Sequence, residues 1–165
     1  MAKISHDSEI LAEGQQVVTA CAFIHRFADG EEKVFLPKRA ATKKFLPGVY
    51  ELPGGHVDFG EDPVTGLKRE INEEFGVEIE VGDPFFVFSY VNEIKKSHSF
   101  EIIYFAKLKN DPEDIKLNPE DHSGFIWVAE EDLPVAYNEA KRADDIEFEA
   151  VRKGFALLRG EALNS

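Results

Sequence analysis

The sequence predicts a mixed α/β (α+β) protein built around a single core. Runs rich in β-branched and aromatic residues alternate with two segments whose apolar residues recur at the spacing of a helix. The chain has 165 residues, of which 43% are hydrophobic, and no break in composition divides it. We therefore expect one domain over residues 16–165, preceded by a polar and irregular arm at residues 1–15.

The strands predicted for the first part of the chain lead into a glycine-rich turn. Residues 17–27 and 33–39 have the composition of strands, and the Asp-Gly pair between them indicates a hairpin. Residues 49–52 are expected to form a short third strand. It ends at Gly54 and Gly55, where glycine permits a positive φ or a close approach of the backbone to a ligand.

A helix is predicted directly after this turn. Asp62 is suited to cap its first amides, Pro63 to occupy its first position, and Gly76 to end it. At about 100° per residue, one narrow arc of this helix is apolar. The arc consists of Val64, Leu67, Ile71 and Phe75.

The second part of the chain alternates in the same way. The strands expected there are residues 79–91, 99–108 and 125–129, with an acidic, solvated loop at residues 110–121. Residues 130–134 are predicted to form a turn or a short helix. Residues 144–159 are predicted to form an amphipathic helix, with Phe148, Val151, Phe155 and Leu158 near one face.

Three glutamates lie beside the apolar arc of the first helix. Glu70, Glu73 and Glu74 are three and four residues apart, so in a helix their carboxylates project side by side, about 5 to 6 Å apart at Cβ. Like charges at this distance repel, and a divalent cation among the oxygens would remove the repulsion. Oxygen ligands favour hard ions such as Mg²⁺. The alternative is a surface helix with a solvated acidic side.

The surrounding residues resemble the Nudix box at every defining position. The matching pattern is Gly55, five residues, Glu61, seven residues, and then Arg69-Glu70-Ile71-any-Glu73-Glu74-any-Gly76-Val77. On this basis the chain resembles a Nudix hydrolase of the MutT-like kind, over residues 17 to about 133. The resemblance implies the Nudix fold, an α/β/α sandwich with a mixed central sheet. It also implies cleavage of nucleoside diphosphates linked to another group.

The resemblance also implies roles for individual residues. Mg²⁺ or Mn²⁺ would be held by Glu70, Glu73 and Glu74 together with the carbonyl of Gly55. Arg69 lies one turn from Glu73 and can bond two carboxylate oxygens at once, so we expect it to orient the glutamates. Glu61 resembles the residue that holds the box together. Gly54 and Gly55 are expected to contact substrate.

The general base has two candidates. Glu70 is the first choice, and the second is Asp121, which lies six positions before Trp127 and is shorter than the glutamate usual there. His122 is expected to be a surface loop histidine. Arg39 is the basic residue for which the resemblance favours a contact with substrate, with an ordinary solvated loop as the alternative.

The substrate class expected is a nucleoside triphosphate or a modified, oxidised nucleotide. The alternatives are a nucleotide sugar, ADP-ribose or a dinucleoside polyphosphate. Phe86, Phe88 and Tyr90 offer surfaces for stacking a base, although aromatic residues that alternate along a strand more often belong to a core. Two other classes compete with a hydrolase, namely a Nudix-fold binding domain without catalysis and an isoprenyl diphosphate isomerase. The isomerase would require an exposed catalytic cysteine.

Composition limits the partners. The formal net charge of −13 argues against a nucleic-acid polymer, because phosphate polymers are bound mainly by Lys and Arg. No apolar run is long enough to cross a membrane, so a cytoplasmic protein is expected, with a homodimer as an option. Cys21 is the single cysteine and lies among apolar residues, which predicts a buried thiol.

Overall fold

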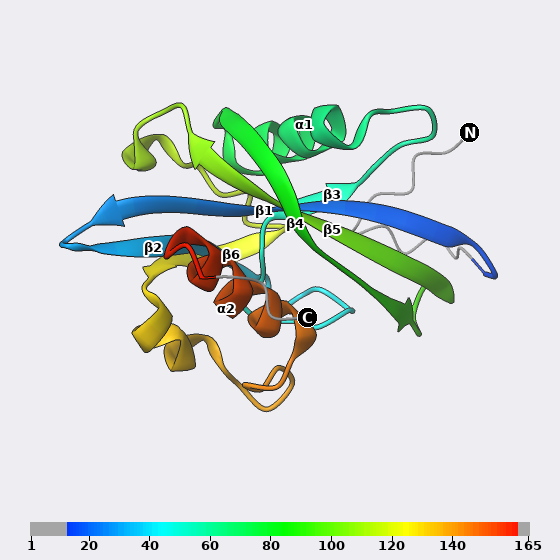
Figure 1. The fold of residues 1–165 in the computed structure, drawn as a ribbon. Coiled ribbons are helices and arrows are strands. Elements are labelled where there is room, and N and C mark those ends of the chain that lie inside the picture. Colours follow the sequence, from blue (N-terminus) through cyan, green and yellow to red (C-terminus); the bar gives the residue numbers. More distant parts are fainter. Residues whose placement is uncertain (1–12, 162–165) are drawn as a thin grey trace.

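The chain folds around a six-stranded mixed sheet with one long helix on each face (Figure 1). A computed structural model describes residues 13–161, so most of the arm expected at residues 1–15 lies outside the described residues. The strands are β1 (Gln16–Ala28), β2 (Glu31–Arg39), β3 (Gly54–His56), β4 (Ile79–Asn92), β5 (Ser97–Leu108) and β6 (His122–Val128).

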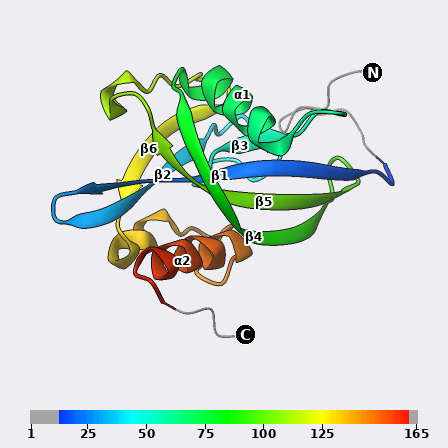
Figure 2. The same cartoon turned by 45° about the horizontal axis from the view of Figure 1, so that its top comes forward.

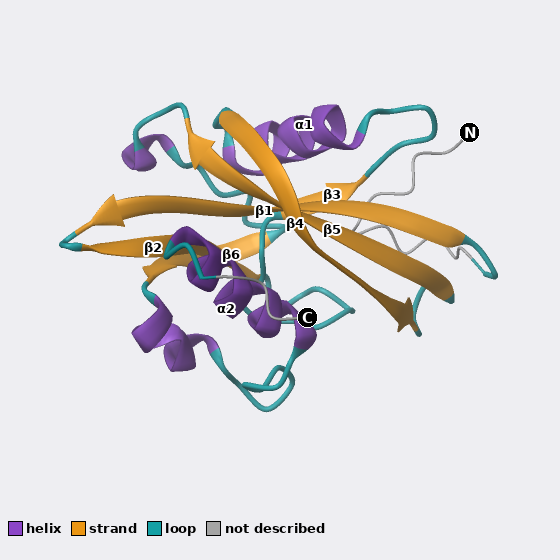
Figure 3. Cartoon of the chain, in the orientation of Figure 1, coloured by secondary structure: helices purple, strands orange, loops and turns teal. Residues whose placement is uncertain are grey.

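The two long helices form the outer layers of the fold. They are α1 (Pro63–Phe75) and α2 (Ile146–Leu158), and Figure 3 shows the sheet between them. Leu67, Ile71 and Phe75 of α1 pack against one face of the sheet. Phe148 and Phe155 of α2 pack against the other face. The turned view in Figure 2 shows the same three layers, and the predicted α/β/α sandwich is confirmed.

The strand order β4-β5-β1-β2-β6 makes β1 central. The β1–β5 pair is parallel and the other pairs are antiparallel, so the sheet is mixed as predicted. Strand β1 changes partner along its length. It pairs with β3 at Thr19 to Cys21 and with β2 from His25 onward. The chain between β2 and β3 therefore connects two different stretches of the same central strand.

The hairpin and the helix caps form as predicted. Asp29 and Gly30 have φ values of 55° and 83°, and two consecutive positive φ angles suit the twist of a two-residue hairpin. The Asp62 side chain accepts hydrogen bonds from the amides of Val64 and Thr65, and Gly76 ends α1 with a φ of 66°.

The glycine segment differs from the prediction. Gly54 and Gly55 lie in strand β3 and neither has a positive φ, so the expected turn is wrong. The strand expected at residues 49–52 is also wrong, because only Tyr50 makes an isolated bridge, to Lys38. The backbone does approach closely at Gly54, but to strand β1, so the expected approach to a ligand stays a prediction. A Cβ at Gly54 would lie 2.1 Å from the carbonyl oxygen of Ala20.

Three later boundaries also differ from the prediction. Strand β6 begins at His122 rather than at residue 125, because its first residue already pairs with Arg39 of β2. The acidic loop contains a short 3₁₀ helix, Pro112–Asp114, capped by the side chain of Asp111. Helix α2 begins at Ile146 because the side chain of Asp145 caps it. Among residues 13–161, no helix has the length and hydropathy needed to cross a bilayer.

Candidate functional site

Helix α1 places the acidic residues at the border between core and solvent. Its apolar arc is fixed against the sheet by Leu67 and Ile71, both of which are fully buried. The neighbouring position, Glu70, is drawn inward and is only 5% exposed, whereas Glu73 one turn later is exposed. The orientation of α1 about its axis therefore buries Glu70 and leaves Glu73 in solvent.

Arg69 is the centre of a network of carboxylates. Its Nε and Nη2 donate to the two carboxylate oxygens of Glu61, at 2.9 and 3.0 Å. Its Nη1 donates to Glu70 at 2.8 Å and to Glu73 at 3.4 Å, and Nη2 also donates to the carbonyl oxygen of His56 at 3.2 Å. The hydrogen bond to Glu61, followed by that to Glu70, raises the pKa of Arg69. The guanidinium joins α1 to β3 and to the loop between them.

Glu61 connects this loop to the helix. Besides Arg69, it accepts a hydrogen bond from the amide of Asp58 at 3.0 Å. Its carboxylate lies directly against Gly66 of α1, where a Cβ would be 2.7 Å from Oε1. A glycine at this position therefore gives the Glu61 side chain the space to reach Arg69.

Gly55 gives Glu70 a similar space. A Cβ at Gly55 would lie 2.4 Å from Cδ of Glu70, so the Glu70 carboxylate lies against the bare backbone of β3. This contact brings a backbone segment and a carboxylate, both with oxygen donors, to the same place. Glycine is required here by close approach, since Gly55 has no positive φ.

The donor set of the box suits a hard divalent cation. Glu70, Glu73, Glu74 and the Gly55 carbonyl offer only oxygen ligands, which Mg²⁺ and Mn²⁺ prefer. As the side chains stand, no three His, Cys, Asp or Glu groups among residues 13–161 converge on one point that could hold an ion. Arg69 holds Glu70 and Glu73 instead. The residues fit a metal by donor type, and the glutamate side chains would have to turn toward the ion.

A second polar group lies where β2 meets β6. Arg39 is 3% exposed, and it donates to the carbonyl oxygen of Phe45 at 3.0 Å and to Glu51 Oε2 at 3.4 Å. The other oxygen of Glu51 is 3.1 Å from Nε2 of His122. The expectation that His122 is a surface histidine is wrong, since its pairing with β2 makes it 3% exposed.

Asp121 lies at the edge of this second group. Its carboxylate forms an ion pair with Lys43 at 2.8 Å and accepts a hydrogen bond from Asn118 at 3.0 Å. The ring of Phe75, the residue after Glu74, packs on the ring of His122 with 5.0 Å between centroids. The end of α1 and the start of β6 are therefore in contact, so residues from both parts of the chain lie near one another.

The structure brings most of the predicted residues into these two groups. Glu61, Arg69, Glu70, Glu73 and Gly55 form the first group, and Arg39 and Asp121 belong to the second. Arg39 is buried and bonded to Glu51, so it is not part of a solvated loop. Gly54 belongs to neither group, because it lies against the backbone of Ala20 in β1.

Four charged residues of a neighbouring cavity, of which Glu101 and Lys141 are buried, were not predicted. Glu51, Glu101, Lys141 and Glu147 line a cavity of about 300 Å³ together with aromatic residues of β4. They come from three parts of the chain, and the sequence shows no motif that joins them. Of these four, only Glu101 could have been suspected from the sequence, because it is a charged residue at an inward position of the alternating strand 99–108.

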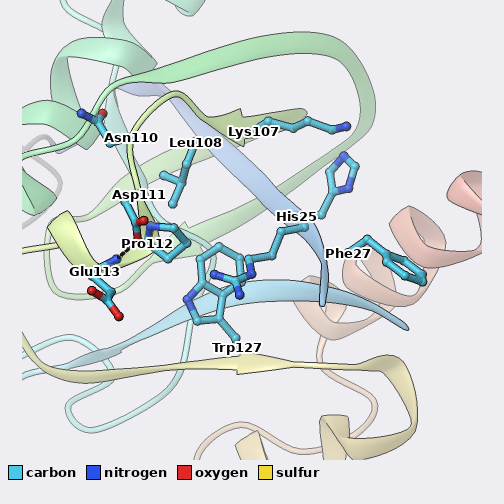
Figure 4. Close-up of a pocket in the computed structure, with 10 residues that line it drawn as sticks. His25, Phe27, Lys107, Leu108, Asn110, Asp111, Pro112, Glu113 and Trp127 are labelled. Atoms are coloured by element: carbon cyan, nitrogen blue, oxygen red, sulfur yellow. Dashed lines mark hydrogen bonds between the residues drawn. The ribbon is translucent and has the colours of Figure 1, made fainter. Parts of the chain in front are cut away.

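A cavity of about 540 Å³ lies at the C-terminal end of β1, and none of the predicted site residues line it (Figure 4). It is lined by His25 and Lys107 and by Trp127, over whose ring the guanidinium of Arg26 lies at 5.2 Å. Cys21 lies elsewhere, in the core. It is 3% exposed, so the predicted buried thiol is confirmed, and burial raises its pKa.

Comparison with known proteins agrees with this geometry. The family model of the NUDIX domain matches residues 16–150. The chain is 25% identical over 143 residues to the uncharacterized Nudix hydrolase YfcD of Shigella flexneri, covering 82% of this chain and 77% of that protein. It is 36% identical over 63 residues to the 8-oxo-dGTP diphosphatase of Haemophilus influenzae, which covers 38% of this chain and 44% of that protein.

A solved structure gives the same result. The crystal structure of a MutT NUDIX hydrolase from Burkholderia pseudomallei is 29% identical to this chain and superposes with a TM-score of 0.65. The match covers 83% of this chain and 98% of the other. The chain therefore belongs to the NUDIX domain family and is a Nudix hydrolase.

Proposed function

We propose that the protein is a metal-dependent pyrophosphohydrolase that cleaves a nucleoside diphosphate linked to a further group. The observation that carries this proposal is the Arg69 network, which gathers Glu61, Glu70 and Glu73 beside the backbone of β3. Such a network suits a site in which several carboxylates must lie close together. A surface helix with a solvated acidic side would not need a shared guanidinium.

We assign Glu70, Glu73, Glu74 and the Gly55 carbonyl as ligands of Mg²⁺ or Mn²⁺. When bound, the ion would neutralise charge on the phosphate oxygens and lower the pKa of a coordinated water. Glu70 is the first candidate to accept the proton of the attacking water, and Asp121 is the second. Arg69 and Glu61 hold the glutamate side chains in place without touching the phosphates.

The proposed substrate is a nucleoside triphosphate or an oxidised nucleotide. The similarity to the Haemophilus influenzae 8-oxo-dGTP diphosphatase supports this class, although it covers 38% of this chain. Nucleotide sugars, ADP-ribose and dinucleoside polyphosphates are the alternatives. Lys43 and Arg39 are basic residues of the second group, and their ion pairs with Asp121 and Glu51 would have to open for either to contact phosphate.

The test is hydrolysis of a nucleotide panel by the full chain with Mg²⁺. The panel contains normal and oxidised nucleoside triphosphates and the three alternative classes. We expect cleavage of one class, its loss with EDTA, and a fall in turnover of at least about a hundredfold in Glu70→Gln and Glu74→Gln. Glu80→Gln is the matched control, because Glu80 is an exposed glutamate of β4 outside the site.

Each result decides between the assignments. Near-normal turnover in either box variant would exclude that glutamate as a metal ligand. No cleavage of any substrate by a folded protein would favour a binding domain without catalysis. Isomerisation of an isoprenyl diphosphate without release of phosphate or pyrophosphate would identify the third class, against which the burial of Cys21 argues.

A further inference from the structure

The cavity of about 300 Å³ lies on the face of the sheet that α2 covers, at the end of β4. Its apolar walls include the rings of Phe45 and Tyr90, which are parallel within 6° with 6.1 Å between centroids. Phe88 and Ile146 also line it. Flat aromatic walls of this kind suit a flat aromatic ligand, which can stack on them.

One polar atom in this cavity has no partner. Glu101 is 4% exposed, and its Oε2 makes no hydrogen bond with any residue between 13 and 161. Its Oε1 accepts from the hydroxyl of Tyr90, at 3.4 Å. Burial, reinforced by the negative charge of Glu147, raises the pKa of the Glu101 carboxyl. A buried oxygen without a partner costs free energy, which a ligand with a matching polar edge would recover.

The charged residues around Glu101 are paired with one another. Lys141 lies 2.6 Å from Glu147 and also donates to the carbonyl oxygen of Tyr50. Burial by itself would lower the pKa of Lys141, but the charge and hydrogen bond of Glu147 together with the charges of Asp145 and Glu51 raise it overall. Glu51 is bonded to Arg39 and His122. Lys141, the cation that lines the cavity, is therefore already paired with Glu147 and is not available to bind a phosphate.

The cavity lies within reach of the box. Glu101 of β5, Thr19 of β1 and His56 of β3 are aligned in one row across three adjacent strands. Neighbouring strands are about 4.8 Å apart, so the backbones at Glu101 and His56 are separated by roughly 10 Å. The carbonyl of His56 accepts from Arg69, which organises the glutamates. The box helix and the cavity lie on opposite faces of the sheet, so a nucleotide that reaches both would have to pass the edge of β3.

We propose that this cavity holds the base of the substrate and that Glu101 is a specificity residue that hydrogen-bonds the polar edge of that base. The inference rests on the proposed function, because it assumes that the phosphates lie at the box. The aromatic walls stack on the ring, Oε2 of Glu101 bonds its N–H or carbonyl edge, and the cavity offers no unpaired lysine or arginine to the phosphates among the residues that line it. The substrate class is therefore a nucleotide with an intact base, and not an organic diphosphate without one.

The experiment compares two substrates that differ only by the base. Full-length wild type and Glu101→Leu are given a nucleoside triphosphate and ribose 5-triphosphate, which carries the same phosphates without a base. We expect wild type to prefer the nucleotide in kcat/KM. In Glu101→Leu that preference should fall by about tenfold or more, mainly through KM, because one hydrogen bond to a buried group is lost.

Cleavage of ribose 5-triphosphate serves as the internal control and should be unchanged by the substitution. Glu101→Gln, which keeps the shape and one acceptor, should lose less than Glu101→Leu, and it remains usable if the leucine variant does not fold. An equal loss on both substrates, or no loss on either, would overturn the inference while leaving the hydrolase proposal intact.

A binding measurement separates failure of the inference from failure of the proposed function. If wild type cleaves neither triphosphate, guanosine and adenosine are titrated into both proteins and followed by NMR. Chemical-shift changes at Phe45 and Tyr90 that disappear in Glu101→Leu would support the base site without any catalysis. Absence of such changes in wild type would overturn it.

Discussion

Arg69 donates hydrogen bonds to three glutamates and to the carbonyl of His56. The sequence predicted its role because an arginine one turn from Glu73 can bond two carboxylate oxygens at once. The contact with His56 could not be predicted, since it depends on the position of β3 beside α1. Arg69 thus makes one contact that helix spacing predicts, with Glu73, and one that only the tertiary structure creates, with His56.

Residues 121 and 122 behave differently from each other although they are neighbours. Asp121 is partly exposed and paired with Lys43, whereas His122 is buried by its pairing with Arg39 and by the ring of Phe75. The sequence placed both in a loop, because a single polar pair before a strand gives no periodicity. The extension of β6 by its neighbour β2 decided where the loop ends.

Glu101 should make the stability of the protein fall as pH rises. Its pKa is raised in the folded state, so above about pH 4.3 the folded protein keeps a proton that the unfolded chain has lost. Because the folded state binds more protons, the free energy of unfolding decreases with increasing pH until the folded pKa is passed. Glu101→Gln does not titrate, so its stability relative to wild type should increase over that range.

The measurement is the melting temperature of both proteins from roughly pH 5 to pH 8. Glu147, whose negative charge helps to raise the pKa of Glu101, loses this neighbour in Glu101→Gln, so the difference between the two curves reports the two carboxyls together. Parallel curves would show that Glu101 keeps an ordinary pKa in the fold.

The contact between α1 and β3 separates the functions of two adjacent glycines. At Gly54 a Cβ would meet the backbone of Ala20 at 2.1 Å, and at Gly55 it would meet the side chain of Glu70 at 2.4 Å. The backbone of β1 cannot move without breaking the sheet, whereas a glutamate side chain can rotate. The first glycine therefore serves the fold and the second serves the position of Glu70.

Gly54→Ala and Gly55→Ala should accordingly fail in different ways. Gly54→Ala should lower the free energy of unfolding by about 1 to 3 kcal/mol or more, through overpacking against β1. Gly55→Ala should keep most of its stability and lose turnover by at least about tenfold, because Glu70 is displaced. Urea unfolding and turnover measured on both variants would check this.

The reverse pattern would contradict the assignment of the two glycines. If Gly55→Ala lost stability and retained turnover per folded molecule, the contact with Glu70 would have no catalytic consequence. Gly48→Ala is not a suitable control, because its φ of 72° introduces a separate strain. Gly124, which has open space around its Cα and no positive φ, is the matched position for a neutral alanine.

The whole molecule carries a formal net charge of −13, and part of that charge is concentrated at the box. Without a cation, mutual repulsion of the glutamates works against folding, and Arg69 compensates only in part. Metal binding should therefore stabilise the folded chain. A ligand at a hundredfold excess over its Kd adds about 2.7 kcal/mol to the free energy of unfolding.

Mg²⁺ should raise the melting temperature of wild type by several degrees, and EDTA should reverse the increase. Glu70→Gln and Glu74→Gln should show a smaller increase, because each removes a proposed ligand. Matched concentrations of a monovalent salt control for general screening of the acidic surface. An increase of equal size in wild type and both variants would place the stabilising metal outside the box.

The sequence by itself determined the family, the mixed α/β class, and helix α1 with its caps, apolar arc and glutamates. These features depend on spacing along a few consecutive turns, and such local periodicity is written directly in the residue order. Only the tertiary structure decided that the glycine segment is a strand, that His122 is buried, and that Glu101 meets Lys141 and Glu147. Those outcomes depend on pairing and packing between segments distant in sequence, whose side chains carry no pattern until the sheet brings them together.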